Sequence, residues 1–112
     1  MARTEKLRPA HLSPDTLPPL DIAGAFVRRT DLSGASLQNA NLAGADARNA
    51  RFVGTDFKDA NLKGTVLLGA DLTDARNLTV EQLSEAIVDE TTLLPDYIDG
   101  SKLVRRPTTV VN

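Results

Sequence analysis

The 112-residue sequence contains no cysteine, no tryptophan and a single histidine, His11. Without cysteine the chain has no disulfide and no thiolate nucleophile, and one histidine cannot form a multi-histidine metal cage. His11 lies among prolines, so we expect it to be a solvent-exposed bystander. The sequence also lacks a P-loop, a nucleotide-binding fingerprint, a nucleophile elbow and the spacing of zinc ligands. We therefore expect no cofactor, no metal and no enzymatic activity.

An excess of charge of one sign is also lacking. The 13 basic and 15 acidic residues give a formal net charge of -2, which attracts a chain neither to nucleic acid nor to an anionic membrane. The opening segment MARTEKLRPA has no apolar signal-peptide region, and no apolar run approaches the roughly 18 residues of a membrane helix. We expect a cytoplasmic protein with no nucleic-acid partner and no membrane partner.

The sequence instead contains a five-residue repeat, which is plain in residues 40–64 as ANLAG ADARN ARFVG TDFKD ANLKG. The third residue of the block is apolar eleven times in succession. This inward column consists of Ile22, Val27, Leu32, Leu37, Leu42, Ala47, Phe52, Phe57, Leu62, Leu67 and Leu72. Two positions after these residues lies a second column, the turn column, in which ten of eleven residues are Gly, Asn or Asp.

A period of five fits neither a helix nor a strand. A helix would rotate successive apolar residues by about 140°, and a strand would place them on alternating faces. The chain must therefore turn every five residues, and Gly, Asn and Asp tolerate the left-handed dihedral angles of such turns. Glycine alternates with other residues from Gly24 to Gly64, which favours an even number of sides. A square coil of four repeats would place Leu42 on Leu62 and would form a solenoid.

These repeats resemble the pentapeptide-repeat family, whose consensus is A(D/N)LXX, because ADLTD, ANLAG and ANLKG fit that consensus. The resemblance covers residues 20–78. It implies an all-β solenoid, namely a right-handed quadrilateral β-helix of just under three coils with a short C-terminal capping helix. Successive coils would lie about 4.8 Å apart, as in any β-ladder.

The chain divides into four expected segments. They are an extended proline-rich N-terminal arm at 1–19, the β-helix at 20–78, a capping helix and loop at 79–98, and a flexible tail at 99–112. The capping segment begins with TVEQ at residues 79–82, which matches a helix capping box. An apolar stripe of Val80, Leu83 and Ile87 follows, so we expect a helix over residues 80–88 that covers the last coil.

Five aspartates recur directly before inward residues and raise the question of paired catalytic carboxylates. They are Asp21, Asp31, Asp46, Asp56 and Asp71. We interpret them as structural, because short polar side chains at such positions form hydrogen bonds with the neighbouring backbone. On one side of the square coil, Asp31, Arg51 and Asp71 would form a ladder of alternating charge.

Any function is expected on the outward-facing residues. On a second side of the square coil, apolar residues replace several of the usual polar ones, and such residues mark contact surfaces. The candidate partner surface therefore comprises Phe26, Arg28, Arg48, Val66 and Leu68. The alternative is that an N- or C-terminal segment of the chain covers this surface.

We predict a protein-interaction or scaffold module, in which a rigid solenoid face and a terminal arm bind a protein partner that the repeat does not identify. The resemblance offers an alternative, a DNA-mimicking modulator of gyrase of the quinolone-resistance kind. Residues 20–78 hold seven acidic and seven basic residues, and this neutrality argues against mimicry of DNA. The resemblance also makes a homodimer an expectation, because few apolar residues precede the first coil to cover its end; the alternative is a monomer in which the N-terminal arm covers that end.

Two substitutions test the inward column. Leu42→Asp is expected to bury an unpaired charge and to lower the free energy of unfolding by several kcal/mol, whereas Lys63→Asp is expected to change it little. Thermal melting followed by circular dichroism measures both variants. Equal melting temperatures would show that the inward column is misassigned.

Overall fold

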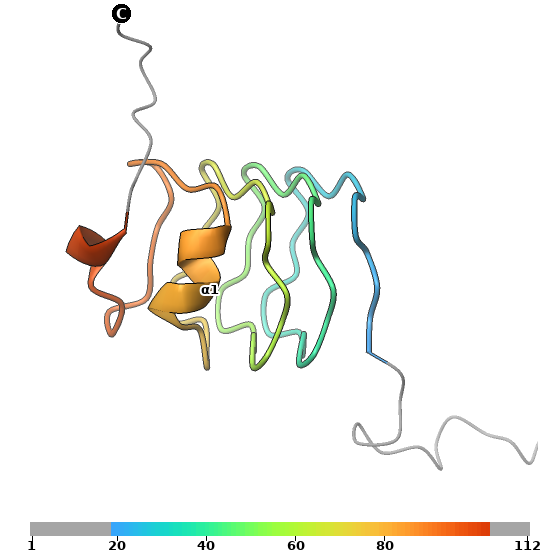
Figure 1. The fold of residues 1–112 in the computed structure, drawn as a ribbon, viewed down its shortest axis with the longest axis horizontal. Coiled ribbons are helices and arrows are strands. Elements are labelled where there is room, and N and C mark those ends of the chain that lie inside the picture. Colours follow the sequence, from blue (N-terminus) through green and yellow to red (C-terminus); the bar gives the residue numbers. More distant parts are fainter. Residues whose placement is uncertain (1–18, 104–112) are drawn as a thin grey trace, which may run out of the picture.

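The structure is a computed structural model that describes residues 19–103 (Figure 1). Residues 1–18 and 104–112 lie outside the described part, and with them almost all of the expected arm, His11 and most of the expected tail. Successive turns of the chain lie side by side, and helix α1 (Val80–Glu85) follows the last complete one.

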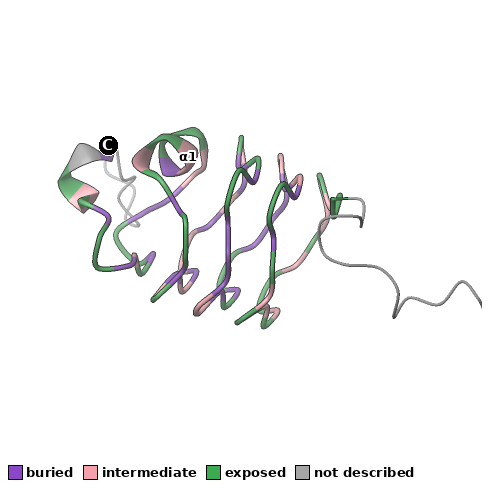
Figure 2. Cartoon of the chain, turned by 90° about the horizontal axis from the view of Figure 1, so that it is seen from below, coloured by how far each residue is buried: buried purple, intermediate pink, exposed green. Residues whose placement is uncertain are grey.

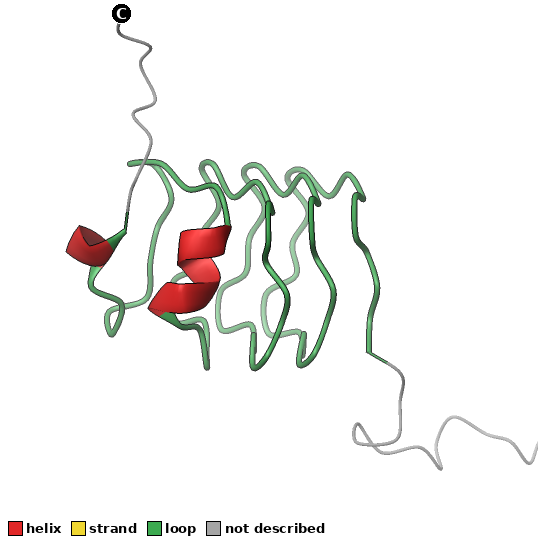
Figure 3. Ribbon diagram, viewed as in Figure 1, coloured by secondary structure: helices red, strands yellow, loops and turns green. Residues whose placement is uncertain are grey.

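A ladder of parallel β-bridges joins residues that are four repeats apart. Asp21 pairs with Asn41, and Asn41 pairs with Asn61. The other three columns are Phe26, Asp46 and Val66; Asp31, Arg51 and Asp71; and Ser36, Asp56 and Arg76. In chain order these columns define sides 1 to 4 of a four-sided solenoid with three levels. Each side contributes a single bridging residue per level, so Figure 3 shows the sides as loops.

Backbone hydrogen bonds link each level to the next in both directions. The N–H of Ile22 donates to the carbonyl of Asn41 at 2.9 Å, and the N–H of Asn41 donates to the carbonyl of Leu20 at 2.8 Å. Equivalent pairs of bonds recur on the other three sides. A level in the middle of the solenoid therefore depends on two neighbouring levels for its backbone partners.

Every residue of the turn column has a positive φ, as the sequence predicts. The glycines have φ between 68° and 76°, and the five other residues have φ between 57° and 60°. A hydrogen bond closes each turn, such as that from the N–H of Ala25 to the carbonyl of Ile22 at 3.0 Å. Glycine adopts this left-handed conformation without strain, and Asn and Asp do so more readily than other residues. Arg29, with φ 57°, belongs to neither group.

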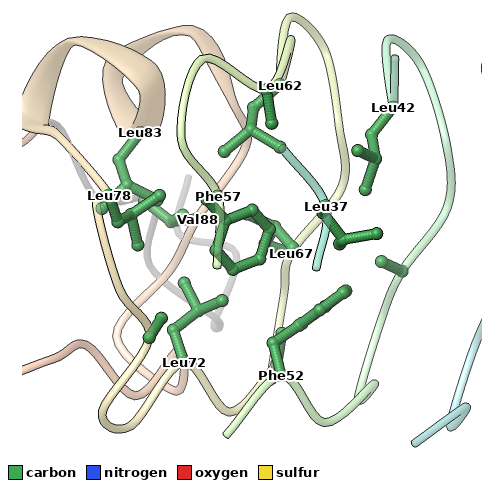
Figure 4. Close-up of a cluster of buried hydrophobic side chains, with 14 of the residues drawn as sticks. Leu37, Leu42, Phe52, Phe57, Leu62, Leu67, Leu72, Leu78, Leu83 and Val88 are labelled. Carbon is green, nitrogen blue, oxygen red and sulfur yellow. The ribbon is translucent and has the colours of Figure 1, made fainter. Parts of the chain in front are cut away.

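The inward column fills the interior of the solenoid (Figure 4). Eight of its members are buried, namely Leu37, Leu42, Ala47, Phe52, Phe57, Leu62, Leu67 and Leu72. The rings of Phe52 and Phe57 lie 5.4 Å apart at an interplanar angle of 56°. On the first level, Ile22, Val27 and Leu32 are only partly buried, and Figure 2 shows the buried residues concentrated on the later levels.

Threonine replaces the usual alanine at three of the small inward positions, and two of these threonines, Thr55 and Thr65, form hydrogen bonds with the preceding level. The hydroxyl of Thr55 donates to the carbonyl of Leu32, and that of Thr65 donates to the carbonyl of Leu42, both at 2.7 Å. Both threonines are fully buried. Because each hydroxyl has a partner on the preceding level, its burial adds a bond between levels.

Helix α1 begins as the sequence predicts but is shorter. The N–H of Gln82 donates to the hydroxyl of Thr79 at 3.0 Å, and the N–H of Thr79 donates to Oε1 of Gln82 at 2.9 Å, so the capping box is present. The amide of Gln82 also donates to the carbonyls of Phe57 and Ala60, which fastens the helix to the solenoid. The helix ends at Glu85, so the expected extension to residue 88 is wrong.

The helix ends early because the chain resumes the ladder after it. The N–H of Ile87 donates to the carbonyl of Thr65, and its carbonyl accepts from the N–H of Leu67, both at 2.8 Å. Leu93 pairs with Asp71 on side 3 in the same way. A partial fourth level therefore follows α1, and its pairs are spaced slightly farther apart in sequence than the four repeats of a regular coil.

A buried carboxylate completes this fourth level. Asp89 is 5% exposed and accepts hydrogen bonds from the N–H and the hydroxyl of Thr91. Burial acts to raise the pKa of Asp89, but hydrogen bonds from Thr91, Thr92 and the N–H of Gly69 outweigh it and hold the pKa below 3.8. Elsewhere in the solenoid, the N–H of a turn residue donates to a backbone carbonyl of the next level, as Gly54 does to Thr73. At Gly69 the carboxylate of Asp89 accepts this bond instead.

The chain stays packed as far as Leu103. The hydroxyl of Tyr97 donates to the carbonyl of Ala75 and accepts from the N–H of Leu78. A 3₁₀ helix, η4 (Gly100–Lys102), precedes Leu103, which is buried. The expected flexible tail is therefore wrong for its first part, up to Leu103.

The positive φ of Arg29 predicts a stabilising substitution. Arg29→Asn is expected to raise the free energy of unfolding by about 0.5–1 kcal/mol, because asparagine adopts the left-handed conformation with less strain. Lys63→Asn, at an exposed position outside the turn column, is the control and is expected to change little. Chemical denaturation measures both, and a loss of stability in Arg29→Asn would contradict the prediction.

Candidate functional site

Side 2 of the solenoid carries the candidate partner surface. Its outward residues are Phe26 and Arg28 on the first level, Asp46 and Arg48 on the second, and Val66 and Leu68 on the third. A coil of four repeats therefore brings residues that are distant in sequence into one column. Arg28 and Arg48 become neighbours in this way, and two like charges on adjacent levels repel each other unless an anion lies between them.

Asp46 supplies that anion. It is only 8% exposed, although it occupies an outward position. Its Oδ2 lies 2.7 Å from Nε of Arg28, and its Oδ1 lies 3.2 Å from Nε of Arg48. The backbone N–H of Arg48 also donates to Oδ1 at 3.3 Å. Both carboxylate oxygens thus bind a guanidinium, which restrains the two arginines on either side of one charge.

These contacts keep the Asp46 carboxyl ionised. Burial acts to raise its pKa, but the hydrogen bonds from Arg28 and Arg48 and the charges of both side chains hold the pKa below 3.8. A lowered pKa in the folded state means that ionised Asp46 stabilises the fold above about pH 4 and that this stabilisation is lost as the pH falls further.

The apolar members of the candidate partner surface do not form one patch. Phe26 is 82% exposed. Val66 and Leu68 are half-buried on the third level, where Val66 pairs with Ile87 of the fourth level. Asp46 separates these residues from Phe26. The accessible part of the surface therefore consists of Phe26 with Arg28 and Arg48, whose side chains are 52% and 45% exposed.

The recurring aspartates are structural, as the sequence predicts. Each accepts a hydrogen bond from the N–H two residues ahead, at 3.0 to 3.3 Å. The same bond recurs after α1, from Thr91 to Asp89 and from Ser101 to Asp99. On side 3, Arg51 lies 3.7 Å from Asp31, and both side chains are exposed. Exposed pairs of this kind contribute little to stability.

Two negative findings hold for the part of the chain that the structure describes. Between residues 19 and 103, no cluster of three or more His, Cys, Asp or Glu side chains could hold a metal ion. Within the same range, no helix combines the length and the apolar composition that a membrane crossing requires.

A hollow of about 440 Å³ lies where the chain leaves side 4 for α1. It is lined by Lys58, Asp59, Ala60, Asn77, Leu78, Thr79 and Gln82. The amide of Asn77 donates to Asp56 at 2.9 Å, and the amide of Gln82 donates to the backbone beside the hollow. These hydrogen bonds fasten the chain where it leaves the solenoid.

The role of Asp46 is the feature of the site that sequence reasoning missed. The sequence grouped it with the other aspartates of the repeat. The available signal was the coil length, which places Arg28 beside Arg48 and leaves Asp46 as the acid between them.

The repeats match the family described as "Pentapeptide repeats", in 8 copies, over residues 21–52, 28–64 and 40–76. Together these segments span half of the 112 residues. The chain belongs to the pentapeptide-repeat family. The five-residue period, the turn column and the ladder of four-repeat coils are the features that this family membership explains.

Two solved pentapeptide repeat proteins resemble the chain. Rfr23 from the cyanobacterium Cyanothece 51142 is 28% identical with a TM-score of 0.61, and the likeness covers 70% of this chain and 52% of Rfr23. The chain thus spans about half the length of Rfr23. The protein alr5209 from Nostoc Pcc 7120 is 28% identical with a TM-score of 0.54, and 81% of this chain and 83% of alr5209 are covered. No curated protein matches the chain.

The pKa of Asp46 gives a prediction for the pH dependence of stability. Asp46→Asn is expected to lower the melting temperature at neutral pH and to reduce the loss of stability between about pH 5 and about pH 3. Part of that loss will persist, since Asp31, Asp56 and Asp89 also have lowered pKa values.

Asp74→Asn is the matched control, because Asp74 is an exposed turn residue whose left-handed conformation asparagine tolerates. Melting temperatures over a series of pH values measure both variants. A pH profile of Asp46→Asn identical to that of the unmodified protein would show that Asp46 does not hold the arginines as described.

Proposed function

We propose that this pentapeptide repeat protein is a non-enzymatic interaction module that presents Phe26, Arg28 and Arg48 to a protein partner. The supporting observation is an exposed aromatic ring next to two arginines that share one buried carboxylate, Asp46. Aromatic residues and arginine are enriched among the residues that dominate binding energy at protein interfaces. Because Asp46 restrains both arginines, less side-chain entropy is lost when a partner binds.

The chemistry of this surface suggests the chemistry of the partner. Asp46 contacts each arginine at Nε, and a guanidinium has four further N–H donors in a plane suited to carboxylates. The proposed partner therefore offers acidic groups beside an apolar pocket for Phe26. The same proposal includes a cytoplasmic location, the right-handed sense of the β-helix and the role of α1 as its cap. The handedness and the capping role rest on the likeness to other family members.

The proposal is tested by capture of proteins from the native host with three forms of the protein. The double variant Arg28→Gln/Arg48→Gln is expected to retain at least about tenfold less of the partner than the unmodified protein, because it removes both positive charges from side 2. The matched control is Lys58→Gln/Lys63→Gln, which removes two exposed charges from other sides and is expected to retain the partner fully. Equal retention by the two double variants would exclude side 2 as the binding surface.

The alternative function, modulation of gyrase by mimicry of DNA, is tested separately by DNA supercoiling. The balanced charges of residues 20–78 favour no effect of the protein on gyrase. Dose-dependent inhibition, or protection of gyrase from a quinolone, would favour the alternative.

A further inference from the structure

Four arginines gather where side 2 turns into side 3, on the first two levels of the solenoid. Arg28 and Arg48 are the last outward residues of side 2 on these levels, and Arg51 is a bridging residue of side 3. Arg29 occupies the turn between the two sides, where its N–H donates to the carbonyl of Arg48 at 3.0 Å. All four residues are exposed. They are called the arginine corner below.

The backbone of Arg29 is strained in a way that the fold does not require. Its φ of 57° is a value that Gly, Asn and Asp adopt more readily, and the residues at the same turn on the next two levels are Asn49 and Gly69. Within residues 19–103, the side chain of Arg29 forms no ion pair that would offset the strain. Strain of this kind is typical of functional sites, which points to a role for the guanidinium of Arg29.

The arginine corner has more positive charge than the neighbouring carboxylates neutralise. Asp46 contacts both Arg28 and Arg48, and Asp31 lies 3.7 Å from Arg51. Both carboxyls are ionised at neutral pH. Four guanidiniums and two carboxylates leave an excess of two positive charges on these levels.

The third level does not neutralise this excess. It contributes two apolar residues to side 2 and Gly69 to the turn. Asp71 follows Arg51 on side 3, but its Oδ1 accepts from the N–H and the hydroxyl of Thr73. Asp71 takes part in no ion pair with another described residue. The described residues therefore leave the two charges of the arginine corner uncompensated.

The size of the excess indicates the chemistry of a ligand. A phosphate monoester carries a charge of about −2 at neutral pH and three acceptor oxygens, whereas a carboxylate carries a single charge. Guanidinium groups bind phosphate oxygens in a bidentate manner. An extended polyanion, such as nucleic acid or an anionic membrane, fits less well, because residues 19–103 include 13 acidic and only 8 basic residues. Most of that surface would repel a polyanion.

We propose that the arginine corner binds a phosphate monoester on a phosphorylated side chain of the protein partner. Asp46 contacts Arg28 and Arg48 at Nε, so their other N–H groups remain for the phosphate oxygens. Arg29 and Arg51 add guanidiniums from the turn and from side 3. This inference rests on the proposed function, because Arg28 and Arg48 belong to both surfaces.

The test is an NMR titration of the full chain with acetyl-phosphoserine N-methylamide, a small probe with one phosphate monoester. Saturable changes are expected in the backbone and Nε–H signals of the arginine corner. Acetyl-glutamate N-methylamide is the matched probe with a carboxylate. It is expected to bind at least about fivefold more weakly, because it carries one negative charge instead of about two.

Arg29→Asn separates binding from folding. This variant is expected to bind the phosphoserine probe at least about fivefold more weakly, because it lacks one guanidinium, although its fold is expected to be more stable. Lys63→Asn is the matched control, since it removes one exposed positive charge from side 1. It is expected to bind the probe as the unmodified protein does.

Unchanged binding of the phosphoserine probe in Arg29→Asn, or equal binding of the glutamate probe, would overturn the proposal. Tighter binding of inorganic phosphate than of the phosphoserine probe would identify free phosphate as the ligand and would also overturn it. The same holds if a single-stranded oligonucleotide or vesicles of anionic phospholipid displace the probe at a lower concentration of phosphate groups. Capture of a partner through side 2 without any binding of the probe would overturn this inference and leave the proposed function standing.

Discussion

At every fifth residue from Gly24 to Asp74 the backbone adopts a positive φ, and this turn carries the next inward residue to the next side of the solenoid. The interior, the ladder and the columns of outward residues all depend on that interval. If one turn were displaced by a residue, the following apolar side chains would point to solvent, because successive side chains of an extended segment alternate in direction. The residues of the turn column are therefore restricted to types that tolerate the left-handed conformation, with Arg29 as the exception.

The sequence predicts the features that depend on local conformation. The turn column and the inward column follow from backbone preference and from the period, and the start of α1 follows from the capping box at Thr79. The end of α1 and the packing of Leu103 could not be predicted in the same way. Ile87 and Leu93 pair with the third level at spacings that match no repeat, so only the three-dimensional structure identifies their partners.

The candidate site likewise has features that the five-residue period predicts and features that only the three-dimensional structure shows. The four-repeat coil was sufficient to predict that Phe26, Arg28 and Arg48 share a side of the solenoid. Their different exposure, and the burial of Asp46, depend on contacts between levels that the period does not specify. A carboxylate that the repeat pattern treats as one of several equivalent aspartates thus becomes the group that orders the surface.

The four-repeat coil also restricts how the length of this chain can change during evolution. A duplication of one whole coil, such as residues 41–60, would insert a level that offers its neighbours the same backbone donors and acceptors as before. It would lengthen the solenoid by about 4.8 Å and leave both ends as they are. A duplication of a single pentapeptide between Asp71 and α1 would instead advance the chain by one side, so that Ile87 and Leu93 could no longer follow Val66 and Asp71 in their columns. Between Asp71 and α1, a duplication therefore keeps the partial fourth level in its columns only if it adds whole coils.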